Sequence, residues 1–173
     1  MFAFVCMAAA LLVRDYQHRR AVTALNSITY RSEDPLRVSA FPNPINPLAW
    51  NGVVETRDFF ELVPVDSGSG QIDPHNLAVV RYKPEETPVS LAAKKSRLGR
   101  VFLDWAAYPL VENERLESNA GYRVQFQDLR FASAETFSRR RGPPLAGYVE
   151  LDPQLRVEDQ YMGQPNREQK HGR

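Results

Sequence analysis

The sequence contains a single cysteine, Cys6, among its 173 residues. One thiol cannot form an internal disulfide, and it cannot complete a zinc site of the Cys₄ or Cys₂His₂ type. An excess of charge is also lacking, because 22 basic residues are matched by 21 acidic ones. Dedicated nucleic-acid binders show a strong basic excess, so we expect no nucleic acid among the partners of this chain.

The sequence motifs of common catalytic sites are missing too. There is no glycine-rich phosphate loop, no G-x-S-x-G elbow and no H-E-x-x-H helix. The three histidines are His18, His75 and His171. His75 and the nearby Asp73 offer two ligands to a metal, whereas a catalytic zinc normally takes three protein ligands. A surface turn explains this segment better, so we assign no catalytic residue, no metal ligand and no cofactor to the chain.

Other polar residues also have a simpler structural explanation. Ser90 lies one helical turn from Lys94, which is common on a polar helix face. Asp104 is either a buried carboxylate or the partner of Arg100 or Arg97 in a salt bridge. The arginines at 139–141 are either a contact for anionic lipid or part of a solvated loop, and the loop is the better explanation. Three aspartates are interpreted as turn or bulge residues: Asp58, Asp128 and Asp152.

The first thirteen residues, Met1–Val13, carry no charged side chain. As a helix they span about 20 Å, whereas the hydrocarbon core of a bilayer is about 30 Å thick. They are either a buried N-terminal helix of a soluble domain or the C-terminal half of a transmembrane helix. We favour the second because nothing amphipathic is visible and basic residues follow at once, from Arg14 to Arg20. The positive-inside rule would then place the rest of the chain in the cytoplasm.

Beyond this N-terminal helix, assigned to residues 1–30, the sequence predicts an α+β domain over residues 36–162. Alternating apolar residues predict a mainly antiparallel sheet of six or seven strands. Prolines between Phe41 and Pro47 make a stiff connector that leads to Trp50. The predicted strands are Leu36–Phe41, Trp50–Thr56, Phe59–Asp66, Leu77–Tyr82, Tyr122–Phe131 with a bulge near Asp128, Leu145–Leu151 and Leu155–Tyr161. The hydrophilic residues 163–173 are predicted to be a disordered tail.

One amphipathic helix is predicted over Pro88–Ala106. Thr87 is a suitable N-cap, and a proline is well tolerated in the first turn. Gly99 interrupts the helix, at a cost of about 1 kcal/mol relative to alanine, which indicates close packing or a break there. An apolar stripe along this helix is expected to face the sheet, and the aromatic residues of the chain are expected to form the core rather than a ligand pocket. The stripe consists of Leu91, Leu98, Val101, Phe102 and Trp105.

The proline connector, followed by Trp50 and Val53–Phe60, resembles the C-terminal region of bacterial membrane-bound metal-dependent hydrolases, which are LexA-binding and associated with the inner membrane. Three further segments are similar, so the resemblance covers most of residues 1–162: Leu98–Pro109, Tyr122–Phe131 and Leu151–Val157. It implies several N-terminal membrane helices whose His and Asp residues bind a metal. Those helices are absent from this sequence, so no catalytic residue is carried over, and any divalent metal would belong to a longer parent protein.

The resemblance leads to two hypotheses. In the first, the chain is the C-terminal, cytoplasm-facing part of a membrane-bound metal-dependent hydrolase at the bacterial inner membrane. In the second, it is a non-catalytic, membrane-tethered module that binds a protein partner through its sheet or through the connector before Trp50. A third and weaker hypothesis is a soluble enzyme that uses Asp73 and His75.

Overall fold

The computed structural model of the chain describes residues 2–43, 46, 48–69, 71–72, 78–116, 120–132 and 145–163. The chain divides into two compact units, Met1–Lys83 and Pro84–Arg173, and each contains one antiparallel sheet with helix packed on it. The predicted α+β class with antiparallel strands is therefore confirmed. The boundary between the units, after Lys83, lies inside residues 36–162, which were predicted to form one domain. The tail predicted at 163–173 lies outside the described residues except for Gly163.

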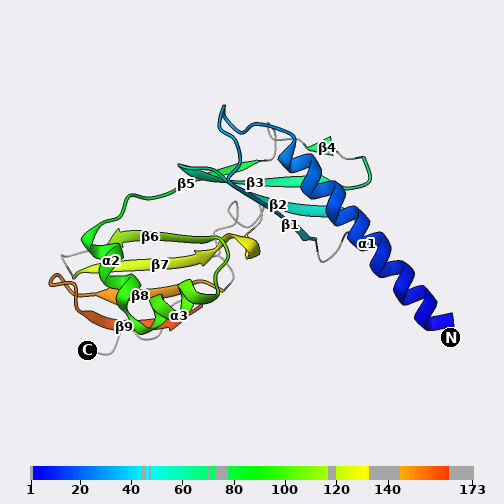
Figure 1. Cartoon of the computed structure of the whole chain (residues 1–173). Helices are drawn as coiled ribbons and strands as arrows, with labels where there is room; N and C mark the ends of the chain where they lie inside the picture. Colours follow the sequence, from blue (N-terminus) through cyan, green and yellow to red (C-terminus); the bar gives the residue numbers. More distant parts are fainter. Residues whose placement is uncertain are drawn as a thin grey trace. The chain divides into compact units, whose positions relative to one another are not determined.

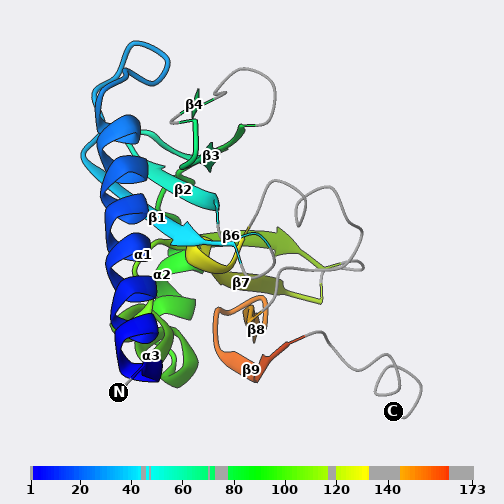
Figure 2. The ribbon, with the colours of Figure 1, turned by 90° about the vertical axis from the view of Figure 1, so that its right-hand side faces the viewer.

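The first unit consists of one long helix, α1 (Phe2–Asn26), on a five-stranded sheet. The strands follow the order β1-β2-β3-β4, and β5 also pairs with β3. Figures 1 and 2 show α1 lying along one face of β1, β2 and β3, with its N-terminal turns extending beyond these strands. The strand bounds are β1 Arg37–Pro42, β2 Ala49–Glu55, β3 Phe59–Asp66, β4 Gln71–Ile72 and β5 Val79–Tyr82.

The hairpin of β2 and β3 forms the centre of this sheet, as the alternation of apolar residues predicts. Gly52 lies opposite Val63 in the antiparallel register, and Val54 and Val63 are buried in the same cluster as Ala21 and Leu25 of α1. α1 packs on the sheet through its C-terminal half, where Ala21 and Leu25 are 1% and 0% exposed. The core of the unit therefore lies between the end of α1 and the middle of the sheet.

Gly52 of β2 is the position that lets α1 approach the sheet. A Cβ atom at residue 52 would lie 2.8 Å from Cδ1 of Leu25 and 2.9 Å from the carbonyl oxygen of Val63. The Tyr30 hydroxyl then donates a hydrogen bond of 2.8 Å to the Leu25 carbonyl oxygen, within the turn that follows the helix. The helix end is thus held by packing on one side and by a buried hydrogen bond on the other.

The second unit consists of two short helices on a four-stranded antiparallel sheet, in the order β6-β7-β8-β9. Both helices cover the same face of this sheet (Figure 1). Ala93 and Phe102 pack there on Val124, Phe126 and Val149 of the strands. The element bounds are α2 Pro88–Lys95, α3 Arg97–Trp105, β6 Pro109–Arg115, β7 Tyr122–Asp128, the 3₁₀ turn η2 Leu129–Phe131, β8 Gly147–Leu151 and β9 Val157–Met162.

The single helix predicted over Pro88–Ala106 is two helices, broken at Ser96. Thr87 is confirmed as the N-cap of α2, in a capping box with Ser90. Ser96 has an extended backbone and caps α3 by accepting a hydrogen bond from the Gly99 N–H at 3.0 Å. A Cβ at residue 99 would lie 2.2 Å from the carbonyl oxygen of Ala93. The close packing expected at Gly99 is present, whereas the helix breaks three residues earlier, at Ser96.

Several finer expectations are wrong. The strand β6 (Pro109–Arg115) is missing from the predicted strands, and the register shift of this sheet lies between Glu150 and Leu151 rather than near Asp128. In the predicted apolar stripe, Phe102 is buried but Val101 is 60% exposed. The 3.6-residue period therefore located the helix correctly but not every residue that it buries.

No helix in the described part of the chain combines the length and the apolar character needed to cross a bilayer. The expectation of a partial transmembrane helix within residues 1–30 is therefore corrected. The physical reason is that α1 carries charged residues after Val13, so no described stretch of it has the roughly 20 apolar residues that a bilayer core requires. The same helix then continues through the charged residues Arg14, Asp15, Arg19 and Arg20.

We expect Gly52→Ala to destabilise the first unit by about 1–3 kcal/mol, because the new methyl group must displace Leu25 or the backbone of β3. Trp50 belongs to this unit and Trp105 to the other, so urea unfolding should be followed by Trp50 fluorescence in a Trp105→Phe background. Gly68→Ala is the matched control, because a Cβ there meets only the Asp66 side chain, at 3.1 Å, and Leu48, at 3.9 Å. Equal unfolding midpoints for the two variants would contradict the packing argument.

Candidate functional site

The N-terminal half of α1 presents a continuous apolar surface to the outside. We call Phe2–Val13 the apolar segment; it contains no charged side chain. Its large side chains are between 55% and 83% exposed: Phe2, Phe4, Val5, Met7, Leu11, Leu12 and Val13. Single exposed apolar residues are normal on protein surfaces, but a contiguous group of this size usually marks a binding surface.

The apolar segment ends where α1 meets the sheet of its own unit. The guanidinium carbon of Arg14 lies 5.7 Å from the centre of the Trp50 ring, and the ring of His18 lies 5.4 Å from it. Trp50 itself is only 3% exposed, and its Nε1 has no hydrogen-bond acceptor among the described residues. Arg14 and His18 therefore cover the indole ring on the side of α1. The N-terminal turns of α1 extend beyond the strands of this unit (Figure 1).

Polar side chains occupy the face of the β6–β9 sheet that is turned away from α2 and α3. Because side chains alternate along a strand, this face carries the neighbours of the core residues. Two rows cross the four strands in register. The first row is Glu114, Arg123, Glu150 and Asp159, and the second is Glu112, Gln125, Tyr148 and Tyr161.

Glu150 is the centre of the polar contacts on this face. Its Oε1 accepts hydrogen bonds from the Arg123 guanidinium at 2.8 Å and 3.0 Å, and from the Tyr161 hydroxyl at 3.1 Å. Arg123 also donates to Glu114 at 3.0 Å, so it joins β6, β7 and β8. Tyr161 stacks on Tyr148 with ring centres 5.4 Å apart. Burial, and then the Glu150 carboxylate, raise the pKa of Tyr161 to about 12.

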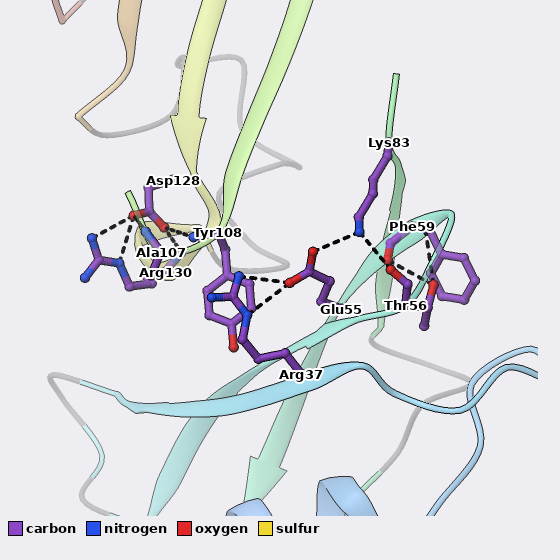
Figure 3. Close-up of polar contacts among 9 residues, drawn as sticks. All are labelled: Arg37, Glu55, Thr56, Phe59, Lys83, Ala107, Tyr108, Asp128 and Arg130. Carbon is purple, nitrogen blue, oxygen red and sulfur yellow. Dashed lines mark hydrogen bonds and ion pairs between the residues drawn. The ribbon is translucent and has the colours of Figure 1, made fainter. Parts of the chain in front are cut away.

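In the first unit, Glu55 joins the sheet to the segment that follows β5. Its carboxylate pairs with Arg37 of β1 at 2.9 Å and with Lys83 at 2.8 Å. The Lys83 ammonium donates a second hydrogen bond, of 2.8 Å, to the Thr56 carbonyl oxygen (Figure 3). The two cations are thus held in place by structural contacts.

In the second unit, Asp128 has a comparable role at the end of β7. Its side chain is 0% exposed and accepts hydrogen bonds from the backbone N–H groups of Ala107, Tyr108 and Arg130 (Figure 3). The Arg130 guanidinium pairs with the same carboxylate at 2.7 Å. Asp128 therefore fixes both the segment that leaves α3 and the 3₁₀ turn η2. The expectation of a turn residue at this position understated its burial.

The structure does not bring together most of the polar residues that the sequence offered as candidate site residues. His18 contacts Trp50, Ser90 belongs to the N-cap of α2, and Lys94 pairs with Glu86 rather than with Ser90. Asp104 is exposed, so it is not a buried carboxylate. Asp73, His75, His171 and the arginines at 139–141 lie outside the described residues. Within the residues that the structure describes, no group of three or more His, Cys, Asp or Glu side chains is placed to hold a metal ion.

The contacts around Glu150 were missed by sequence reasoning. Arg123 was assigned correctly to a strand, and the hairpin that carries Glu150 and Tyr161 was expected. The missing information was the register, because a shift by one residue moves every side chain to the other face. The turn at 152–154 bears on the register of β8 and β9, and so on the Tyr161 contact, but not on the register of β7 and β8 that sets the Arg123 contact.

We expect Tyr161 to make the stability of the second unit depend on pH above 10. Its pKa is about 12 when folded against 10.0 when unfolded, so its contribution is complete below pH 10 and is lost as the pH rises towards 12. The difference in unfolding free energy between the wild type and Tyr161→Phe should therefore change only above pH 10. An ultraviolet titration should show a phenol with a midpoint near 12 that Tyr161→Phe removes and Glu150→Gln shifts downwards. A midpoint near 10 for that phenol would contradict the geometry.

Comparison with protein families gives one similarity. Residues 88–172 match the family model described as the YfhP C-terminal alpha/beta plait domain. The match extends over just under half of the chain and takes in α2, α3 and all four strands of the second sheet. No curated protein matches the chain, and no solved structure does.

This similarity corrects the resemblance proposed from the sequence. The matched family is an alpha/beta plait domain and not a membrane-bound metal-dependent hydrolase family. The inner-membrane location and the membrane and hydrolase assignments rested on that resemblance and on the predicted transmembrane helix, so they are wrong as well. The proline–tryptophan signature that suggested them lies in the first unit, outside the matched residues.

Proposed function

We propose that this chain is a protein-interaction module rather than a catalyst, and that the apolar segment of α1 is its binding surface. The observation that carries the proposal is the exposure of seven large apolar side chains over Phe2–Val13. Polar side chains elsewhere support it, because the best-placed ones serve the structure: Glu55 joins strands, Asp128 caps a turn and Glu150 ties three strands together.

The size of the surface favours binding over incidental exposure. Side chains of this size show on the order of 150–200 Å² each when free, so seven of them at these exposures present roughly 800 Å². That is the area that one partner contributes to a standard protein–protein interface, and it exceeds the patch of about 300–600 Å² found on a typical monomer. Covering it provides about 20 kcal/mol of gross hydrophobic free energy before the costs of association.

The form of the surface also favours a protein partner. A helix that is apolar on all sides is normally buried in a protein core or in a bilayer, and no described helix of this chain has the length and apolar character of a membrane span. Helix-in-groove binding uses apolar anchors at i, i+4 and i+7. Phe4, Ala8 and Leu11 have that spacing, and Val5 and Leu12 flank them.

Photocrosslinking in the cells that make the protein tests this proposal. A benzophenone side chain should replace Phe4 or Leu12, which are 73% and 71% exposed. We expect discrete protein adducts from both positions, at least fivefold more than from the control position Val101, which is 60% exposed on α3. The absence of a protein adduct at Phe4 and Leu12, or equal adducts from Val101, would refute the proposal.

A further inference from the structure

We infer that the partner is a different protein that holds the apolar segment in a groove with three apolar walls and an acidic rim, and that the open side of this groove faces the sheet of the first unit. This inference rests on the proposed function, because it describes the partner of the same surface. Its basis is the distribution of the exposed side chains around α1. Successive residues of an α-helix project about 100° apart, so four consecutive residues sample four sides of the helix.

Large side chains occupy three of these four sides. Residues three, four, seven or eleven positions apart share one side of a helix. The large exposed side chains fall into three such groups: Phe4, Met7 and Leu11; Val5 and Leu12; Phe2 and Val13. A single partner helix or a flat surface reaches one group and leaves the others in water, so a partner that buries them all must contact α1 on three sides.

The fourth side of the segment carries small side chains and has the same direction as the docked side of α1. Ala3 and Ala10 lie on this side, one near each end of the segment. Steps of four, four and three residues lead from Ala10 to Arg14, His18 and Ala21, which contact the sheet. The segment itself extends beyond the strands of the first unit (Figure 1). A groove that is open on this side therefore reaches the large side chains without displacing the sheet.

The area of the surface also requires an enclosing site. The seven large side chains expose roughly 800 Å² together, which is what one partner contributes to a standard interface. A contact on one side of the helix would bury only about a third of this area, in the size range of crystal-packing contacts. A specific complex of standard size therefore needs walls on all three sides that carry large residues.

Charge complementarity defines the chemistry of the groove. The segment has no charged side chain, so the walls are apolar along their whole length. The residues that follow, 14–20, contain three arginines and one aspartate. Asp15 pairs with Arg19 at 2.9 Å, which leaves an excess of positive charge at the mouth of the groove. Acidic side chains on the rim of the partner complement that excess.

Photocrosslinking at four consecutive residues tests the groove in the cells that make the protein. A benzophenone side chain replaces Ala10, Leu11, Leu12 or Val13 in turn, which samples all four sides within about one helical turn. We expect the same partner protein in adducts from residues 11, 12 and 13, with at least fivefold higher yield than from residue 10, although all four positions are exposed. Adducts from only one or two of the three sides, or an equal yield from residue 10, would overturn the inference and leave the proposed function standing.

Arg19→Glu tests the acidic rim. Arg19 lies seven residues after Leu12 on the same side of α1, and its side chain is 77% exposed. We expect this change to lower the adduct yield from residue 12 at least threefold. Arg97→Glu makes the same change at an exposed site of the second unit and should leave the yield unchanged. The fluorescence of Trp50 in a Trp105→Phe background shows whether the first unit remains folded.

Three further results would overturn the inference. The first is an equal yield from residue 12 with and without Arg19→Glu, and the second is adducts with other copies of this chain in place of a different protein. The third is adducts with lipid alone, which would refute the proposed function as well.

Discussion

The contact between Leu25 and Gly52 determines how closely α1 can pack on the sheet of the first unit. The space for the Leu25 side chain exists only because residue 52 has no Cβ, since that atom would lie 2.8 Å from Leu25. This contact sets the height of α1 above β2 and β3, and the Tyr30 hydrogen bond then closes the turn behind the helix. Because the helix is docked at its C-terminal end, its direction is fixed, and its first turns must extend away from the sheet. The exposure of Phe2–Val13 thus follows from packing at the opposite end of the same helix.

The second unit also packs helix on one face of its sheet, but with two shorter helices. Breaking the helix at Ser96 gives two helical segments, and Gly99 lets the start of α3 pass close to Ala93, because a Cβ at residue 99 would lie 2.2 Å from the Ala93 carbonyl oxygen. The segment that connects α3 to β6 is held by Asp128, whose carboxylate accepts hydrogen bonds from the backbone N–H groups of Ala107 and Tyr108. A buried carboxylate is costly unless it is paired and hydrogen-bonded, and Arg130 with three backbone N–H groups meets that condition.

The features that the sequence predicted are those that depend on local pattern. The β2–β3 hairpin followed from alternating apolar residues between Trp50 and Val65, and the N-cap at Thr87 followed from the adjoining proline. Features that depend on pairing between distant residues did not follow. The bonds of Arg123 to Glu114 and Glu150 require the registers of two hairpins, and a single residue of slippage would remove them. The strand β6, which begins at Pro109, was not predicted, although proline is tolerated at the first residue of a strand.

The N-terminal run shows why composition alone misled the interpretation. Twelve apolar residues in a row suggest a membrane helix, but the structure places them in one rigid element with the charged residues from Arg14 to Arg20. The described helix holds no stretch with the length and apolar character of a membrane span. Its apolar residues expose an area comparable to what one partner contributes to a protein interface of standard size, and composition alone does not reveal that area.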